Sequence, residues 1–357
     1  MSYSRPDETW GYEPPETASP ADEPAWGEQE APAEPPRPAR RGMALLRRAA
    51  RGGRAPASES SEAGPERRPG DTGGAPADEA GDHTMPPPTP SLLHRLPAVA
   101  ATVVISAGLI LGTQLDRPAY AAGIAVLQLA MLVCLVWTRR VAGAWVPLAV
   151  GAALAVAVDW AAVAWTPVSM LPITVLLAVA FQAAAFGQIL RRDHKGVIEV
   201  LGFTMILCVA VCGYTCYIAL SRLGSAPPAM YSAVVAAGTA ILAARAVDLV
   251  MPDPRINRQV TRGAFGIVIG TMCGTASAAY AGLVIEGPDP RQAAIGGLLV
   301  ALTAVLADLA CGYMSASRRI DGEGTAPLPV IGVAGPLLAF ALAGPVVYLL
   351  SAYYIID

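Results

Sequence analysis

Three ionisable side chains stand out because they lie inside long apolar segments, where a charge is costly. Arg245 and Asp248 are three residues apart near the end of one segment, and Asp308 lies deeper in another. A charge at mid-membrane costs on the order of 3 kcal/mol or more, so each intramembrane carboxylate is a candidate functional site. The spacing of Arg245 and Asp248 lets them pair on one helix face, whereas Asp308 needs a partner from a neighbouring helix or a basic loop.

A structural interpretation of these residues competes with the functional one. A buried ion pair can simply order a helical bundle. For Arg245 and Asp248 both interpretations stay open. For Asp308 the functional interpretation is favoured, because its own segment holds no partner.

Arginines gather in two loops next to these carboxylates, over residues 251–262 and 315–324. A positively charged pocket between the loops would suit an anionic headgroup or nucleotide phosphates. The candidates for binding phosphate are Arg258, Arg262, Arg318 and Arg319, and the candidates for a metal or catalytic role are Asp248 and Asp308.

Two further carboxylates lie closer to the ends of apolar segments. Glu199 is three residues into its segment, and Asp159 lies beside Trp160 near the outer end of another. We expect both at the membrane interface, where a charge is cheaper.

Cysteine and glycine patterns predict packing more than chemistry. Cys208, Cys212 and Cys216 recur every four residues, which places them on one helix face. A packing stripe is favoured over a metal site, because no His or carboxylate joins them. The glycines of 263–274 lack the pattern of a phosphate loop and favour close helix packing.

Composition places these residues in a membrane protein. Of 357 residues, 54% are hydrophobic and only 15% are charged, against about 25% charged in an ordinary soluble domain. About 20 apolar residues cross the hydrocarbon core as a helix. The sequence therefore predicts an all-α, polytopic membrane bundle of about nine helices, at residues 96–115, 119–137, 141–165, 168–190, 197–220, 229–250, 263–285, 292–314 and 327–356.

The basic residues of the loops predict the orientation. Alternate loops carry ten of them against three in the others. This bias indicates a multi-pass protein of the cell membrane with a cytoplasmic N-terminal tail and its C-terminus outside. The ten are Arg139, Arg140, Arg191, Arg192, Lys195, Arg255, Arg258, Arg262, Arg318 and Arg319, and the three are Arg117, Arg222 and Arg291.

Residues 1–95 differ in composition from the membrane domain, 96–357. Their first part is rich in Pro, Glu and Ala, and such a segment cannot bury enough apolar surface to fold, so a disordered tail is expected. The basic segment 37–54 is interpreted as an unstructured linker, with binding to anionic lipid as the alternative. Expected partners are membrane lipids, including anionic phospholipid, with a homodimer as a further option, and nucleic acid is excluded.

Three segments in the last third carry a resemblance to a known family. They are INRQVTRGAFGIVIGTMCGT (Ile256–Thr275), GGLLVALTAVLADLACGYM (Gly296–Met314) and LPVIGVAGPLLAFALAGPVVYLL (Leu328–Leu350). In order and spacing this region, about 229–357 and clearest over 245–350, resembles the phosphatidate cytidylyltransferases (CDP-diacylglycerol synthases). A long disordered tail is also common in such proteins from high-GC Gram-positive bacteria.

The resemblance implies a metal-assisted reaction of CTP with phosphatidic acid at the cytoplasmic face. In the family, acidic residues hold the metal ions; Asp308 matches one of them, and Asp248 lies roughly where the family has an Asp ahead of the basic loop. The chain departs from the pattern elsewhere: Cys311 and Gly312 replace a Glu and a Ser, and Ile331 and Val333 fall within the family's His-Gly-Gly signature.

These departures favour a non-catalytic homologue that binds lipid or a partner and needs no cofactor. One alternative is an active cytidylyltransferase, in which Asp248 and Asp308 hold Mg²⁺ and the four arginines meet phosphates. The other alternative is a small-solute transporter or a membrane scaffold.

Overall fold

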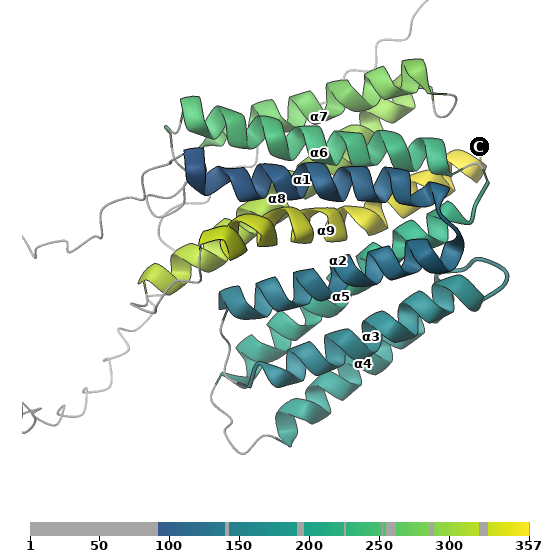
Figure 1. Ribbon diagram of the computed structural model, residues 1–357, viewed down its shortest axis with the longest axis vertical. Coiled ribbons are helices and arrows are strands. Elements are labelled where there is room, and N and C mark those ends of the chain that lie inside the picture. The colour runs from purple at the N-terminus through teal and green to yellow at the C-terminus, as the bar shows by residue number, and fades with distance from the viewer. Residues whose placement is uncertain are drawn as a thin grey trace, which may run out of the picture. The chain divides into compact units, whose positions relative to one another are not determined.

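The helix positions predicted from hydropathy are confirmed by the computed structural model. The structure describes residues 92–139, 143–190, 196–224, 226–251, 253–254, 262–285, 289–320 and 328–356. Over these residues it holds nine helices long and apolar enough to cross a membrane, and no strand (Figure 1). The helices are α1 (Leu92–Leu111, then a short 3-10 turn, Gly112–Gln114), α2 (Arg117–Arg139), α3 (Trp145–Ala164), α4 (Leu171–Ile189), α5 (Val197–Ser221), α6 (Pro227–Val250), α7 (Ala264–Val284), α8 (Pro290–Ile320) and α9 (Leu328–Ile356).

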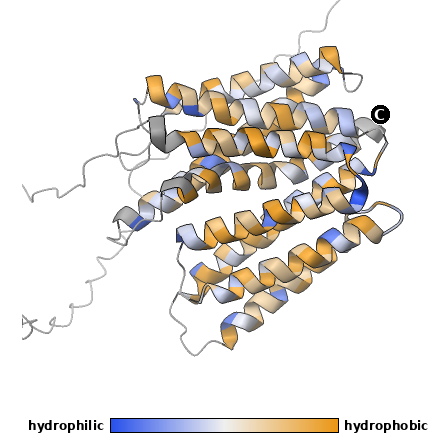
Figure 2. Cartoon of the chain, viewed as in Figure 1, coloured by the Kyte–Doolittle hydropathy of each residue, from blue (hydrophilic) through white to orange (hydrophobic). Residues whose placement is uncertain are grey.

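The chain is therefore a polytopic helical membrane protein. Hydrocarbon offers no partner for backbone N–H and C=O groups, so a spanning segment satisfies them within its own helix. Apolar residues accordingly predominate along the helices in Figure 2. Large apolar side chains face outward on α1 and α4, where Val104 is 66% exposed and Phe186 is 64% exposed, as expected for surfaces that contact lipid.

Several helix boundaries differ from the predicted ones by a few residues. Helix α1 begins at Leu92, within the last four residues predicted for the tail, and α8 continues to Ile320, six residues beyond the predicted 314. The rest of the predicted tail, including the basic segment 37–54, lies outside the described residues.

Helix α9 lies between two groups of helices. It contacts α1, α6 and α8 on one side and α2 and α5 on the other, while α3 and α4 pack farther out against α5 (Figure 1). The fully buried Phe340 belongs to this helix. Its central place explains why α9 can be apolar around its whole circumference.

Helices α5 and α9 cross with their backbones in close contact. A Cβ atom at Gly213 would overlap the carbonyl oxygen of Ala341, and one at Gly344 would overlap the carbonyl of Gly213. Next to this crossing, Tyr214 and Tyr217 donate hydrogen bonds of 2.8 and 3.0 Å to two carbonyls of α9, those of Leu337 and Phe340. Glycine at the crossing lets the tyrosines reach the α9 backbone.

Successive helices run in opposite directions, so the ends of several helices meet at each end of the bundle. Polar contacts join some of these helix ends. At one end, Arg139 of α2 pairs with the exposed Glu199 at the start of α5, at 2.5 Å. At the other end, Arg222 donates to the carbonyls of Ala162 and Trp165 where α3 finishes, at 2.6 and 2.8 Å. Glu199 is exposed at the start of α5, and its place at the membrane interface, like the orientation, stays a prediction.

Candidate functional site

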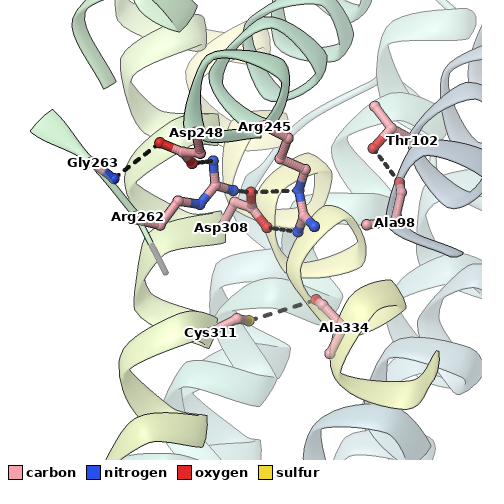
Figure 3. Close-up of polar contacts among 9 residues, drawn as sticks. All are labelled: Ala98, Thr102, Arg245, Asp248, Arg262, Gly263, Asp308, Cys311 and Ala334. Carbon is pink, nitrogen blue, oxygen red and sulfur yellow. Dashed lines mark hydrogen bonds and ion pairs between the residues drawn. The ribbon is translucent and has the colours of Figure 1, made fainter. Parts of the chain in front are cut away.

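Arg245 and Asp308 form the centre of a buried cluster of charges (Figure 3). Arg245 of α6 donates from Nε to Oδ2 of Asp308 at 3.0 Å and from Nη2 to Oδ1 at 2.5 Å. The two parallel bonds use the planar guanidinium as a fork that matches the carboxylate. The partner predicted for Asp308 from a neighbouring helix is thus confirmed.

Arg262 links the second carboxylate to the first. It lies two residues before α7, and its Nη1 is 3.1 Å from Oδ2 of Asp248. Its Nη2 also contacts Oδ2 of Asp308. The backbone N–H of Gly263 donates to the other oxygen of Asp248 at 2.9 Å. Arg245, Asp248, Arg262 and Asp308, called the charge cluster below, therefore form one connected network.

Among the described residues, the charge cluster holds two positive and two negative side chains and is largely closed to solvent. The side chains of Asp248 and Asp308 are 0% exposed, and those of Arg262 and Arg245 are 8% and 13% exposed. Two positive charges meet two negative ones. Pairing of this kind is what makes ionised groups tolerable in a low-dielectric interior.

The local sequence of α6 and α7 explains how the cluster is positioned. The three-residue spacing of Arg245 and Asp248 puts both on the face of α6 that meets α7 and α8. Close packing brings Arg262 within reach, because a Cβ at Gly270 of α7 would lie only 2.7 Å from the carbonyl of Ala240. The packing role predicted for the glycines of 263–274 is confirmed.

A glycine of α9 completes the site. A Cβ at Gly335 would overlap Oδ1 of Asp308 and lie 2.9 Å from Nη2 of Arg245. The α9 backbone thus covers the bidentate pair directly. One helical turn farther along α8, Cys311 contacts the carbonyl of Ala334 at 3.6 Å, in the position where the resembled family has a glutamate.

The four arginines predicted to bind phosphate do not lie together in one described pocket. Arg262 is inside the charge cluster, and Arg318 is buried, with Nη1 donating to the carbonyl of Thr138 near the end of α2 at 2.6 Å. Arg258 and the side chain of Arg319 lie outside the described residues. Arg245, which the sequence pairs only with Asp248, is a central member of the site. The sequence feature that indicates this role is a charged arginine inside an apolar segment, where a charge is energetically costly.

The arrangement does not fit the metal site that the resemblance implies. Within the described part of the chain, no group of three or more His, Cys, Asp or Glu side chains could hold a metal ion. Asp248 and Asp308 do converge, but the guanidiniums of Arg245 and Arg262 contact their oxygens. A Mg²⁺ ion prefers octahedral oxygen ligands and water, and it would have to displace both arginines from a dry interior.

A second polar cluster lies among α2, α3 and α5, and sequence reasoning missed it. Asp159 of α3, expected at the membrane interface, is instead buried in the bundle, at 7% exposure. Gln128, at the midpoint of α2, donates to Asp159 Oδ1 at 3.0 Å, and Thr215 of α5 donates to the same oxygen at 2.6 Å. The sequence feature that could have indicated this cluster is the amide side chain of Gln128 in the middle of an apolar segment.

Comparison of the chain with family models, with curated proteins and with solved structures finds no match. Its function is therefore argued from the site itself.

Proposed function

We propose that this protein is a non-catalytic membrane relative of the phosphatidate cytidylyltransferases, which binds lipid or a protein partner. One observation carries the proposal. Asp248 and Asp308, the two carboxylates that are the sequence's candidates for metal binding, are both paired with arginines inside the bundle.

Nucleotidyl transfer needs what this cluster lacks. Metal ions must bridge the nucleotide phosphates and reach them through a solvent-filled cleft, with carboxylate oxygens free to coordinate. Here Asp308 receives hydrogen bonds from Arg245 on both oxygens and a further contact from Arg262. Neither carboxylate is exposed. The oxygens that would hold a metal hold helices together instead.

The cluster has a clear structural use in such a protein. It ties α6 to α8 through Arg245 and Asp308, and it fixes the start of α7 through Arg262. Removing one partner of a buried ion pair costs about 3–5 kcal/mol, because the other charge is left uncompensated. A purely structural role therefore accounts for all four side chains without catalysis.

The outer faces support lipid binding. Helix α7 packs its glycines against α6 and turns large apolar side chains away from the bundle: Phe265, Val268 and Met272 are 43%, 56% and 64% exposed. In a membrane these side chains meet acyl chains. The proposal leaves an anionic headgroup to Arg258 and Arg319, whose side chains lie outside the described ones, since Arg262 and Arg318 are engaged within the protein.

An active phosphatidate cytidylyltransferase is the second candidate, favoured by the convergence of Asp248 and Asp308 on one cluster. Purified full-length protein in lipid nanodiscs is incubated with CTP, Mg²⁺ and phosphatidic acid, and CDP-diacylglycerol is measured. We expect no product above a reaction without protein. Product that depends on Mg²⁺ and is lost in Asp308→Asn would establish the enzyme instead.

Lipid binding is tested separately by native mass spectrometry. We expect more bound lipid with phosphatidic acid than with phosphatidylcholine at equal concentration. Equal retention of the two lipids would remove the anionic-headgroup part of the proposal and leave a protein partner as the ligand.

A further inference from the structure

The polar cluster of Asp159, Gln128 and Thr215 has an uneven distribution of hydrogen bonds. Both donors, Nε2 of Gln128 and Oγ1 of Thr215, bond to Oδ1 of Asp159, at 3.0 and 2.6 Å. The other carboxyl oxygen, Oδ2, is buried and has no partner. An ionised carboxylate carries equal charge on its two oxygens and would attract donors to both. Two donors on one oxygen fit a carbonyl, which leaves the other oxygen as the place for a proton.

The amide of Gln128 shows the complementary pattern. Its Nε2 also lies 3.2 Å from the carbonyl oxygen of Val211, and a carbonyl only accepts, so this atom must be the nitrogen rather than the oxygen. The remaining amide atom is then the oxygen Oε1, which is buried without a partner. Nε2 of Gln128 thus lies within hydrogen-bond distance of Asp159 Oδ1, the Val211 carbonyl and Thr215 Oγ1. Oε1 of Gln128 and Oδ2 of Asp159 are both left without a partner.

No cation balances Asp159 among the described residues. The elements packed against α3 are α2, α4 and α5. The titratable group of α5 that interacts electrostatically with Asp159 is the buried thiol of Cys212, and the described α4 carries no charged residue. Arg222, at the end of α5, donates to backbone carbonyls of α3. An ionised Asp159 would be an uncompensated charge in a dry interior.

We propose that Asp159 is a proton-binding site within the membrane: Oδ2 takes up one proton from solvent and donates it to Oε1 of Gln128. The carboxyl group passes from charge −1 to neutral, and no bond other than O–H forms. The two side chains then make a carboxylic acid–amide pair, with the Gln128 N–H donating to Oδ1 and the Asp159 O–H donating to Oε1. This pairing gives both unpartnered oxygens a hydrogen bond.

A monovalent metal cation such as Na⁺ is the competing ligand, because it would also be bound by two free oxygens. The proton is favoured since an alkali cation requires more oxygen ligands than Oδ2 and Oε1, and Oδ1 is already occupied by two donors. The site belongs to α2, α3 and α5. It is distinct from the charge cluster of α6, α7 and α8, and it stands or falls independently of the proposed function.

Infrared spectroscopy of the full-length protein in nanodiscs tests the site, because a protonated carboxyl group has a carbonyl stretch that an ionised one lacks. Asp248 and Asp308 are each paired with an arginine, so the variant at Asp159 identifies the band of the proposed site. We expect one such band, shifted in ²H₂O, present in the wild type and in the control Asp116→Asn, and missing in Asp159→Asn.

A second variant, Thr215→Val, tests the same site if Asp159→Asn does not fold. Thr215→Val keeps the size of the side chain but removes one donor to Oδ1, so the band should persist and move to higher frequency. A wild-type spectrum without the band, or a band that neither variant changes, overturns the proposal. A band that disappears when NaCl replaces choline chloride at constant ionic strength overturns the proton in favour of Na⁺.

Discussion

Arg245 of α6 holds both carboxylate oxygens of Asp308 of α8, at 3.0 and 2.5 Å, beneath a glycine of α9. The two residues are 63 positions apart in sequence, and their pairing joins two helices. The pair places a full negative charge inside an apolar segment. The bidentate contact and the glycine above it leave the Asp308 side chain little freedom, and the first prediction concerns its removal.

Asp308→Asn should lower the free energy of unfolding by about 3–5 kcal/mol, because Arg245 and Arg262 lose a buried partner. Denaturant unfolding of the purified protein in detergent measures the loss. The exposed Asp116 supplies the control, and Asp116→Asn should change stability by no more than about 0.5 kcal/mol. Equal stability of both variants would mean that the cluster does not hold the helices together.

Replacing the pair by apolar residues should cost less than breaking it. The double variant Arg245→Met, Asp308→Leu removes both charges at once, and buried ion pairs replaced in this way are often neutral in stability. The double variant is therefore expected to be more stable than either single one, a coupling that a double-mutant cycle measures. Simple addition of the two single effects would contradict the bidentate contact.

Gly335→Ala should destabilise the protein because its Cβ would overlap Oδ1 of Asp308. Overpacking of this kind costs about 1–3 kcal/mol. Gly123→Ala in α2 is a matched control, since a Cβ there meets nothing within 4 Å. Helix propensity then predicts a gain of about 0.5–1 kcal/mol. The two variants should therefore shift the melting temperature in opposite directions.

Arg318→Gln should weaken the attachment of α8 to α2. The buried guanidinium donates to the carbonyl of Thr138 at 2.6 Å, and hydrogen bonds to a charged group contribute about 1.5–3 kcal/mol. Arg139→Gln is the comparison, because Arg139 pairs with an exposed Glu199 and surface pairs contribute at most about 1 kcal/mol. A larger loss for Arg139→Gln would reverse the assigned importance of the two arginines.

The orientation is tested with single cysteines in intact cells. Thr166→Cys, after α3, should react with a membrane-impermeant maleimide added outside. Leu190→Cys, after α4, should react only after the cells are opened. Both positions are exposed at helix ends. The opposite labelling would reverse the topology predicted from the loop arginines.

Local properties of the sequence were enough to determine the nine helices and the residues worth suspecting. In hydrocarbon each helix satisfies its own backbone, so apolar length alone predicts where it lies. The cost of a charge likewise marked Arg245, Asp248 and Asp308 before any contact was known. The resemblance of the last third to a lipid-nucleotide synthase remains a proposal.

Which side chains contact each other is determined only by the tertiary structure. Helical periodicity tells which residues share a face, but it does not tell which other helix that face meets. Arg262 therefore reaches two aspartates instead of a free phosphate site, and Asp159 lies against Gln128 instead of at the interface. Both outcomes depend on which helices pack together, and that choice rests on glycine and alanine contacts spread over residues far apart in the chain.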